Sequence, residues 1–113
     1  MMIVKASSNS EGANIPNKEL MLKMDEYNDE LIAAGVRVMA KGLHPSSEGY
    51  RLSFPIEQNE TILTAGPFKP EKDVVAGLFL IEVSSHEEAM KWFLKVPDPQ
   101  GNGEGQVELR QVY

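Results

Sequence analysis

The 113-residue sequence contains no cysteine and only two histidines, His44 and His86. The absence of cysteine excludes a disulfide scaffold, a thiolate nucleophile and a zinc site with cysteine ligands. A metal site built on both histidines would require their two loops to converge, so we expect no metal and no cofactor. The chain is still long enough to form a core without disulfides or a structural metal, because about 65% of the unfolded surface becomes buried at this size.

Positive charge and long apolar runs are also scarce. Lysine and arginine number 11 against 17 aspartates and glutamates, which gives a formal net charge of −6. Because phosphate contacts need clustered basic side chains, we expect no nucleic-acid partner. The apolar run at residues 1–4 is too short for a secretory signal, and no window approaches the roughly 18 apolar residues of a membrane span. We therefore expect a cytoplasmic protein without a membrane partner.

Hydrophobic residues make up 42% of the chain and charged residues 25%, a mixture typical of one globular domain over residues 1–113. Two stripes at helical spacing predict helices, the first opening at residues 16–17 and stopping at Gly35, the second capped by Ser84 or Ser85. Residues 7–16 are predicted to be a loop. The stripes are Leu20, Met24, Tyr27 and Leu31, then Ala89, Trp92, Phe93 and Val96. Apolar and alternating runs predict strands at 2–6, 36–40, 50–54, 60–64, 74–83 and 107–112.

The predicted order is β-α-β-β-β-α-β, which is typical of an α+β ferredoxin-like sandwich with an extra β-hairpin. The strand at 74–83 is apolar on both faces and is therefore predicted to be central. In so short a chain, two helices cover only one face of the sheet. An open apolar face would exceed the few hundred Å² that monomers tolerate, so we expect a homodimer in which two sheets pair about a two-fold axis.

Several short motifs, taken in their order along the chain, resemble those of the YCII-related (DGPF-domain) family. They are ELIAAGV at 30–36, GLHPS at 42–46, GPF at 66–68 with Lys72, AGLFLI at 76–81, and EEA at 87–89 with Trp92 and Pro97. The resemblance implies a dimeric α/β-barrel fold in a small bacterial protein. Some relatives look like dehydrochlorinases or muconolactone-handling enzymes, and some are associated with alternative sigma factors.

The chain departs from the family pattern at Ala65, which stands where the DGPF motif has its aspartate. The first helix also lacks the histidine that distant members carry in a proposed His–Asp catalytic pair. That pair therefore does not carry over to this chain.

His44 is the strongest candidate for chemistry, because imidazole gains and loses a proton near neutral pH and can act as a general base. It lies in a loop bounded by glycine and proline, and its acidic partner would be Asp73 or Glu48. The alternative is a loop histidine that hydrogen-bonds local backbone. His86, beside two glutamates in a helical first turn, is interpreted as a surface residue.

Three further residues are candidates for ligand binding. Phe68 could cover a flat ligand with Lys72 as the anchor for an anion, and Arg51 could bind a carboxylate. The structural alternatives are that Phe68 fills a pocket or the core, Lys72 is solvated, and Arg51 pairs across the hairpin with Glu57 or Glu60.

Three hypotheses of function follow. The first is a small-molecule-binding protein or degenerate enzyme. Its pocket would lie between helices and sheet near the dimer interface, with His44 and Phe68 in its wall and Arg51 or Lys72 as a further lining residue. The second is a lyase or isomerase acting on a lactone or carboxylic acid, with His44 as general base. The third is an interaction module for a transcription regulator, without chemistry of its own.

Overall fold

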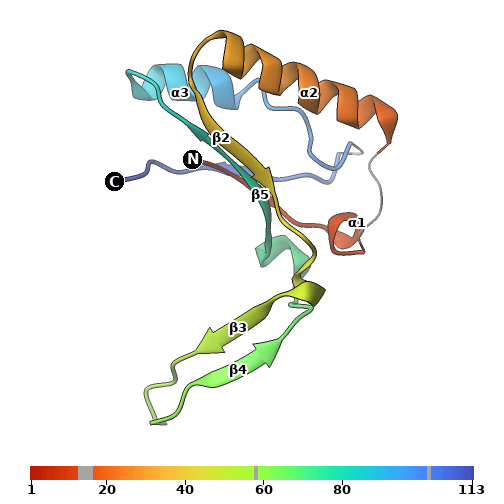
Figure 1. The fold of residues 1–113 in the computed structure, drawn as a ribbon, viewed down its shortest axis with the longest axis vertical. Coiled ribbons are helices and arrows are strands. Elements are labelled where there is room, and N and C mark those ends of the chain that lie inside the picture. Colours follow the sequence, from red (N-terminus) through yellow and green to blue (C-terminus); the bar gives the residue numbers. More distant parts are fainter. Residues whose placement is uncertain (13–16, 58, 102) are drawn as a thin grey trace.

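The computed structural model describes residues 1–12, 17–57, 59–101 and 103–113, which form a mixed α+β fold (Figure 1). Its helices and turns are α1 (Ser8–Glu11), α2 (Lys18–Ala33), η1 (Ser46–Glu48), η2 (Glu71–Asp73) and α3 (His86–Phe93). Its strands are β1 (Met2–Lys5), β2 (Arg37–Gly42), β3 (Tyr50–Ser53), β4 (Ile62–Ala65), β5 (Val75–Ile81) and β6 (Val107–Leu109).

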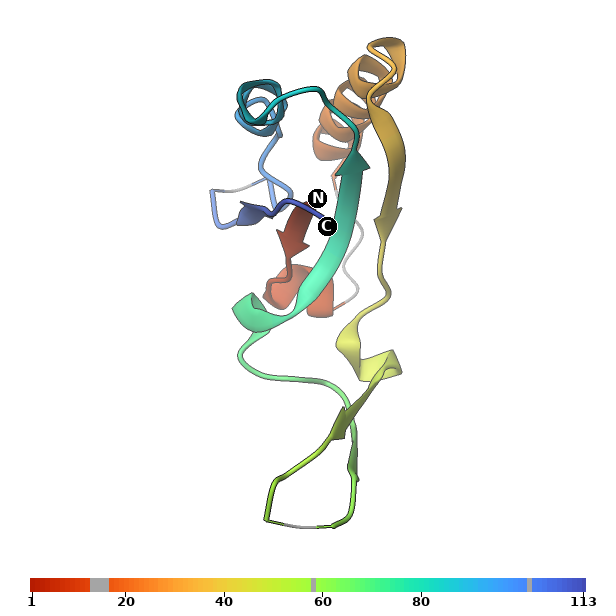
Figure 2. The same cartoon turned by 90° about the vertical axis from the view of Figure 1, so that its left-hand side faces the viewer.

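Four of the strands form one antiparallel sheet in the order β2-β5-β1-β6. The apolar strand β5 lies between β2 and β1, which confirms its predicted central position. Helices α2 and α3 pack on one face of this sheet, so the fold is compatible with the predicted ferredoxin-like sandwich. The hairpin β3–β4 forms a separate two-stranded sheet that projects away from the helices (Figures 1 and 2).

Both predicted long helices are present, and local chemistry sets their ends. The side chain of Asn17 accepts a hydrogen bond from the backbone of Leu20 and caps α2, which stops before Gly35 at φ 71°. That left-handed backbone suits glycine, as predicted. Ser85 caps α3 by accepting from the backbone of Glu88. Helix α3 ends at Phe93, three residues before Val96, the last residue of the predicted stripe.

One prediction of a loop was wrong, because residues 8–11 form the short helix α1. Ser7 begins it with a reciprocal capping box, in which the Ser7 side chain accepts from the backbone of Ser10 and the Ser10 side chain accepts from the backbone of Ser7. Two serines at this spacing satisfy the first turn's free N–H groups as a serine and a glutamate would. Residues 13–16 of the same predicted loop lie outside the described residues.

Alternation along the strand predicted at 36–40 places Val36, Val38 and Ala40 on one apolar face, and this prediction is wrong in part. Val36 is buried, but Val38 is 55% exposed. The pairing of β2 with β5 shifts register between Arg37 and Met39. Such an irregularity interrupts the alternation of faces, so Val38 does not follow Val36 into the core. The final strand is likewise shorter than predicted and ends at Leu109.

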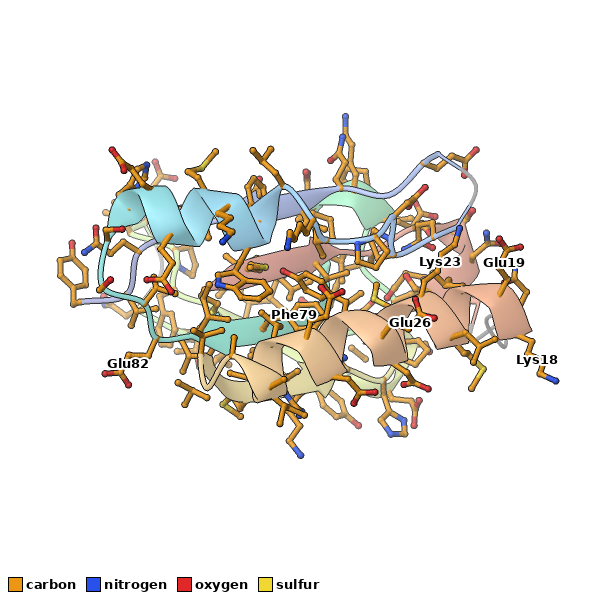
Figure 3. All side chains as sticks on the ribbon, turned by 90° about the horizontal axis from the view of Figure 1, so that it is seen from above. Lys18, Glu19, Lys23, Glu26, Phe79 and Glu82 are labelled. Atoms are coloured by element: carbon orange, nitrogen blue, oxygen red, sulfur yellow. The ribbon has the colours of Figure 1, made fainter. Side chains whose placement is uncertain are left out.

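The core lies between the helices and the sheet. Met2 and Leu31 are fully buried, and Phe79 of β5 lies between the two helices in the view from above (Figure 3). The Tyr27 ring meets the Phe79 ring edge-on, with 5.5 Å between their centres. The Tyr27 hydroxyl donates to the Trp92 carbonyl at 2.8 Å, which ties α2 to α3. These contacts fix the distance between the helices and the sheet.

Candidate functional site

The GLHPS and GPF segments meet at Ser46, the first residue of η1. The Ser46 backbone N–H donates to the Glu11 carboxylate at 2.9 Å, and its hydroxyl donates to the same carboxylate. The Ser46 hydroxyl also accepts from the backbone N–H of Phe68 at 3.0 Å. Ser46 is buried. We call Glu11, Ser46, Gly66 and Phe68 the hairpin junction, because they join β3–β4 to the rest of the fold.

Gly66 approaches the η1 backbone too closely for any side chain. Its N–H donates to the Gly49 carbonyl at 2.9 Å. A Cβ built on Gly66 would lie 1.7 Å from the carbonyl oxygen of Ser46 and 2.6 Å from its carbonyl carbon. Glycine at this position is therefore required by the contact between two backbone segments.

Arg51 and Phe68, two of the predicted ligand-binding residues, contact one another. The Arg51 guanidinium carbon lies 4.1 Å from the centre of the Phe68 ring. A cation over an aromatic face is worth about 0.5–1 kcal/mol at an exposed site. One face of the Phe68 ring is thus occupied by Arg51. Lys72 lies on η2 with its side chain exposed.

His44 has an acidic partner, as its predicted role requires. Its Nδ1 lies 3.1 Å from Oε2 of Glu48, four residues further along the chain. The His44 side chain is 85% exposed and the Glu48 side chain 60% exposed. The pair therefore lies at the surface of a single chain, and a catalytic role for His44 stays a prediction.

The larger of the two best-formed cavities lies between α2 and the sheet and has a volume of about 670 Å³. This volume is within the range of about 300–1,000 Å³ found for small-molecule pockets. Apolar side chains contributed by β1, α2 and β5 include Val4, Leu20, Met24 and Phe79. We call this space the α2 cavity. His44, Arg51, Phe68 and Lys72 do not line it.

The polar lining of the α2 cavity is positively charged, although the chain as a whole is acidic. Arg37 of β2 lines it from the helix-covered face, where it pairs with Ile81, and none of the described lining residues is an aspartate or a glutamate. Amide side chains also line it, among them Asn28 of α2. The cavity therefore combines an apolar part with cationic and amide groups, the usual composition of a ligand site.

Two buried polar atoms in this lining lack a hydrogen-bond partner among the described residues. They are Nε of Arg37 and Oδ1 of Asn28. The Nδ2 of Asn28 is satisfied, because it donates to the Met24 carbonyl at 3.1 Å. Nearly all buried polar groups in proteins are paired, and leaving one unpaired costs about 1–3 kcal/mol. An unpartnered donor and an unpartnered acceptor thus belong to residues that line the same cavity.

Sequence reasoning missed both residues. The alternation over residues 36–41 places Arg37 opposite the apolar Val36, and the helical stripe over residues 20–31 does not include Asn28. A signal existed at Asn28, because it lies four residues after Met24 and three before Leu31, next to the buried stripe. Asparagine is a poor helix former, so an asparagine at the margin of an apolar stripe indicates a role for its side chain.

A second cavity of about 490 Å³ lies near the start of α3, where His86 and Arg110 line it. Within the part of the chain that the structure describes, no three histidine or acidic side chains are placed to share a metal ion. Nor does any helix there combine the length and hydrophobicity that crossing a bilayer requires. The α2 cavity remains the best-developed candidate site.

The fold and the cavity define a small α+β protein with a pocket between α2 and its sheet. Residues 1–113, the whole chain, match the model of the family described as the YCII-related domain. The chain belongs to this family, which confirms the resemblance seen in its motifs. A comparison with curated proteins finds no match.

Proposed function

We propose that the protein binds a small organic anion in the α2 cavity. The observation that carries this proposal is the pair of buried, unpartnered atoms, Nε of Arg37 and Oδ1 of Asn28, in the wall of one cavity. A ligand with an acceptor for Arg37 and a donor for Asn28 would satisfy both. The energetic cost of leaving them unpaired then becomes part of the affinity for that ligand.

The charges of the cavity support an anion over a neutral or cationic ligand. Arg37 faces no acidic group among the described lining residues. A guanidinium keeps its charge at all physiological pH values and binds carboxylates with directed hydrogen bonds. The side chains of Leu20, Met24 and Phe79 suit an apolar or aromatic body attached to that carboxylate.

Benzoate and methyl benzoate test the charge, because they have similar shapes, neither can donate a hydrogen bond to Asn28, and only benzoate is an anion. We expect benzoate to raise the melting temperature in a dose-dependent way and methyl benzoate to have little effect. Replacing Arg37 with methionine should weaken benzoate binding at least about tenfold, since hydrogen bonds to charged groups are worth about 1.5–3 kcal/mol. The same variant should melt no lower than the wild type without ligand, because it removes a buried unpaired donor. Calorimetric titration and thermal melting measure the two effects.

The matched control is Arg51→Met, which removes an arginine outside the cavity and should leave benzoate binding unchanged. Equal binding of benzoate and methyl benzoate, or undiminished binding by Arg37→Met, would contradict the proposed anion site.

We further infer that two copies pair through the sheet face that carries no helix, as in a dimeric α/β barrel. The support is that Ile3, Leu78 and Leu80, which alternate with the core residues Met2, Val4 and Phe79, are only partly covered. A second apolar sheet would cover them. Light scattering at micromolar concentration should then give about twice the 12.5 kDa mass of one chain.

A lyase or isomerase with His44 as general base is the alternative that one observation favours. That observation is the 3.1 Å contact between His44 and Glu48, because a carboxylate can orient an imidazole for proton transfer. The expected result is turnover of a lactone or a chlorinated carboxylic acid that His44→Ala abolishes while the melting temperature stays within about 2 °C, since an exposed ion pair contributes little to stability. Absorbance and chloride release measure turnover. Equal turnover by wild type and variant would remove His44 from the chemistry.

A further inference from the structure

The β3–β4 hairpin has one apolar face that nothing in the described chain covers. Register pairs Tyr50 with Ala65 and Leu52 with Leu63, so these four side chains share a face. Arg51 and Thr64, which also pair, lie on the opposite face. Tyr50 and Leu63 are 73% and 68% exposed. Phe54 and Ile56, in the connection that follows β3, are more than 70% exposed as well.

The hairpin extends the molecule beyond the shape of a compact domain. The radius of gyration is 16.1 Å, whereas a compact domain of this length has about 13 Å. Figures 1 and 2 show the hairpin at the far end from α2 and α3. Because an isolated two-stranded hairpin is at best marginally stable in water, this one needs a cover.

The exposed apolar area is large enough to form half of a stable interface. Large aromatic side chains bury about 150–250 Å² each, so the hairpin exposes on the order of 600 Å² of apolar surface. A standard interface buries about 800 Å² per partner. Two hairpins exchanged about a two-fold axis exceed this value, because each chain then buries both its own hairpin and the surface that receives the partner's hairpin.

Charge argues against nucleic acid and an anionic membrane as the occupant. Glu57 and Glu60 lie in the exposed connection between β3 and β4, and the chain carries a net charge of −6. A protein surface is therefore the fitting cover. A second copy offers one, because the hairpin projects from the end of the sheet that is proposed to pair, and a partner paired there lies beside it (Figure 1).

We propose that the hairpin is an arm that docks on a second copy of this chain in a reciprocal dimer. This inference rests on the proposed homodimer and adds to it a second contact surface. The arm carries the apolar face of Tyr50, Leu52 and Leu63 across to the partner. The hairpin junction sets its direction, because Gly66 and Phe68 fix the end of β4 against η1.

Leu63→Lys tests the arm, with Thr64→Lys as the matched control one residue away on the opposite face. Leu63 is exposed in the single chain, so its replacement should leave folding intact, as circular dichroism and thermal melting can check. A two-fold dimer contains the substitution twice, and each buried leucine contributes about tenfold to affinity, so the dissociation constant should rise about a hundredfold. Thr64→Lys should dimerise like the wild type. Sedimentation over a concentration series measures all three constants.

Chemical labelling gives an independent readout, because the chain has no cysteine of its own. Ile56→Cys should react with a maleimide several-fold more slowly at concentrations where the dimer forms than at high dilution. Lys23→Cys, on the outer side of α2, should react equally fast at both concentrations. If Leu63→Lys leaves the affinity of the dimer unchanged, and Ile56→Cys reacts equally fast at both concentrations, the arm is contradicted. The sheet-paired dimer is then still supported. A wild type that stays monomeric at about 100 times the micromolar concentration used for light scattering overturns both the arm and the sheet-paired dimer.

Discussion

Replacing Gly66 with alanine is expected to lower the free energy of unfolding by about 3 kcal/mol or more. The added Cβ would lie 1.7 Å from the Ser46 carbonyl oxygen and 3.2 Å from the Ser47 nitrogen, and both belong to backbone that cannot turn aside. Relieving the overlap must move the end of β4 away from η1. That movement would break the bond from the Phe68 N–H to the Ser46 hydroxyl and leave a buried group unpaired.

The measurement is urea unfolding, together with thermal melting, where a fall of more than about 10 °C is expected. Gly42→Ala is the matched control, because a Cβ at Gly42 meets nothing within 4 Å and its backbone needs no positive φ. If the two variants are equally stable, the close contact between β4 and η1 does not exist as described. Gly66→Ala should also weaken dimerisation, since the junction orients the hairpin.

Alkaline pH is expected to destabilise the protein through Tyr27. Burial, and then the charge of Glu30, raise the pKa of Tyr27 from its ordinary value of 10.0 to about 12. Below pH 10 the phenol is neutral in both the folded and the unfolded chain, and its contribution to stability is fully present. Above pH 10 the unfolded chain loses this proton while the folded chain keeps it. Stability therefore falls as pH rises from 10 to 12, by on the order of 2 kcal/mol.

Tyr27→Phe separates this effect from other alkaline titrations. At neutral pH the variant should be less stable by about 0.5–1.5 kcal/mol, because it removes the hydrogen bond from Tyr27 to the Trp92 carbonyl, which keeps only the Lys95 N–H as a donor. Toward pH 12 the difference between variant and wild type should disappear. Urea unfolding at several pH values measures this convergence, and Tyr50→Phe, at an exposed tyrosine, should show none of it. Parallel curves up to pH 12 would show that Tyr27 titrates normally.

The sequence predicted the elements wherever pattern and local chemistry agreed. The stripe Leu20, Met24, Tyr27 and Leu31 marks the buried side of α2, and Gly35 supplies the left-handed stop. The apolar run around Phe79 placed β5 in the centre of the sheet. These features depend on residues close together in the chain, whose spacing alone fixes which face can be buried.

The errors occurred where a distant partner decided the outcome. Helix α1 presents Glu11 to Ser46, a contact across 35 positions that no local pattern reveals. Val38 is exposed because the register of β2 against β5 shifts beside it, and that shift depends on the partner strand. Arg51 could have paired with Glu57 or Glu60 across the hairpin, yet its guanidinium lies over Phe68.

By itself, the sequence determined the family, the mixed α+β class, the two long helices and a central β5, because each depends on spacing, caps and turn residues along the chain. Tertiary structure alone decided that the cation Arg37 lines an apolar cavity beneath α2, and that Gly66 must be glycine. The same holds for the hairpin, which stands apart from the sheet with its apolar face uncovered. The physical reason is that burial, charge balance and unpaired polar groups belong to the space between elements, which no single segment encodes.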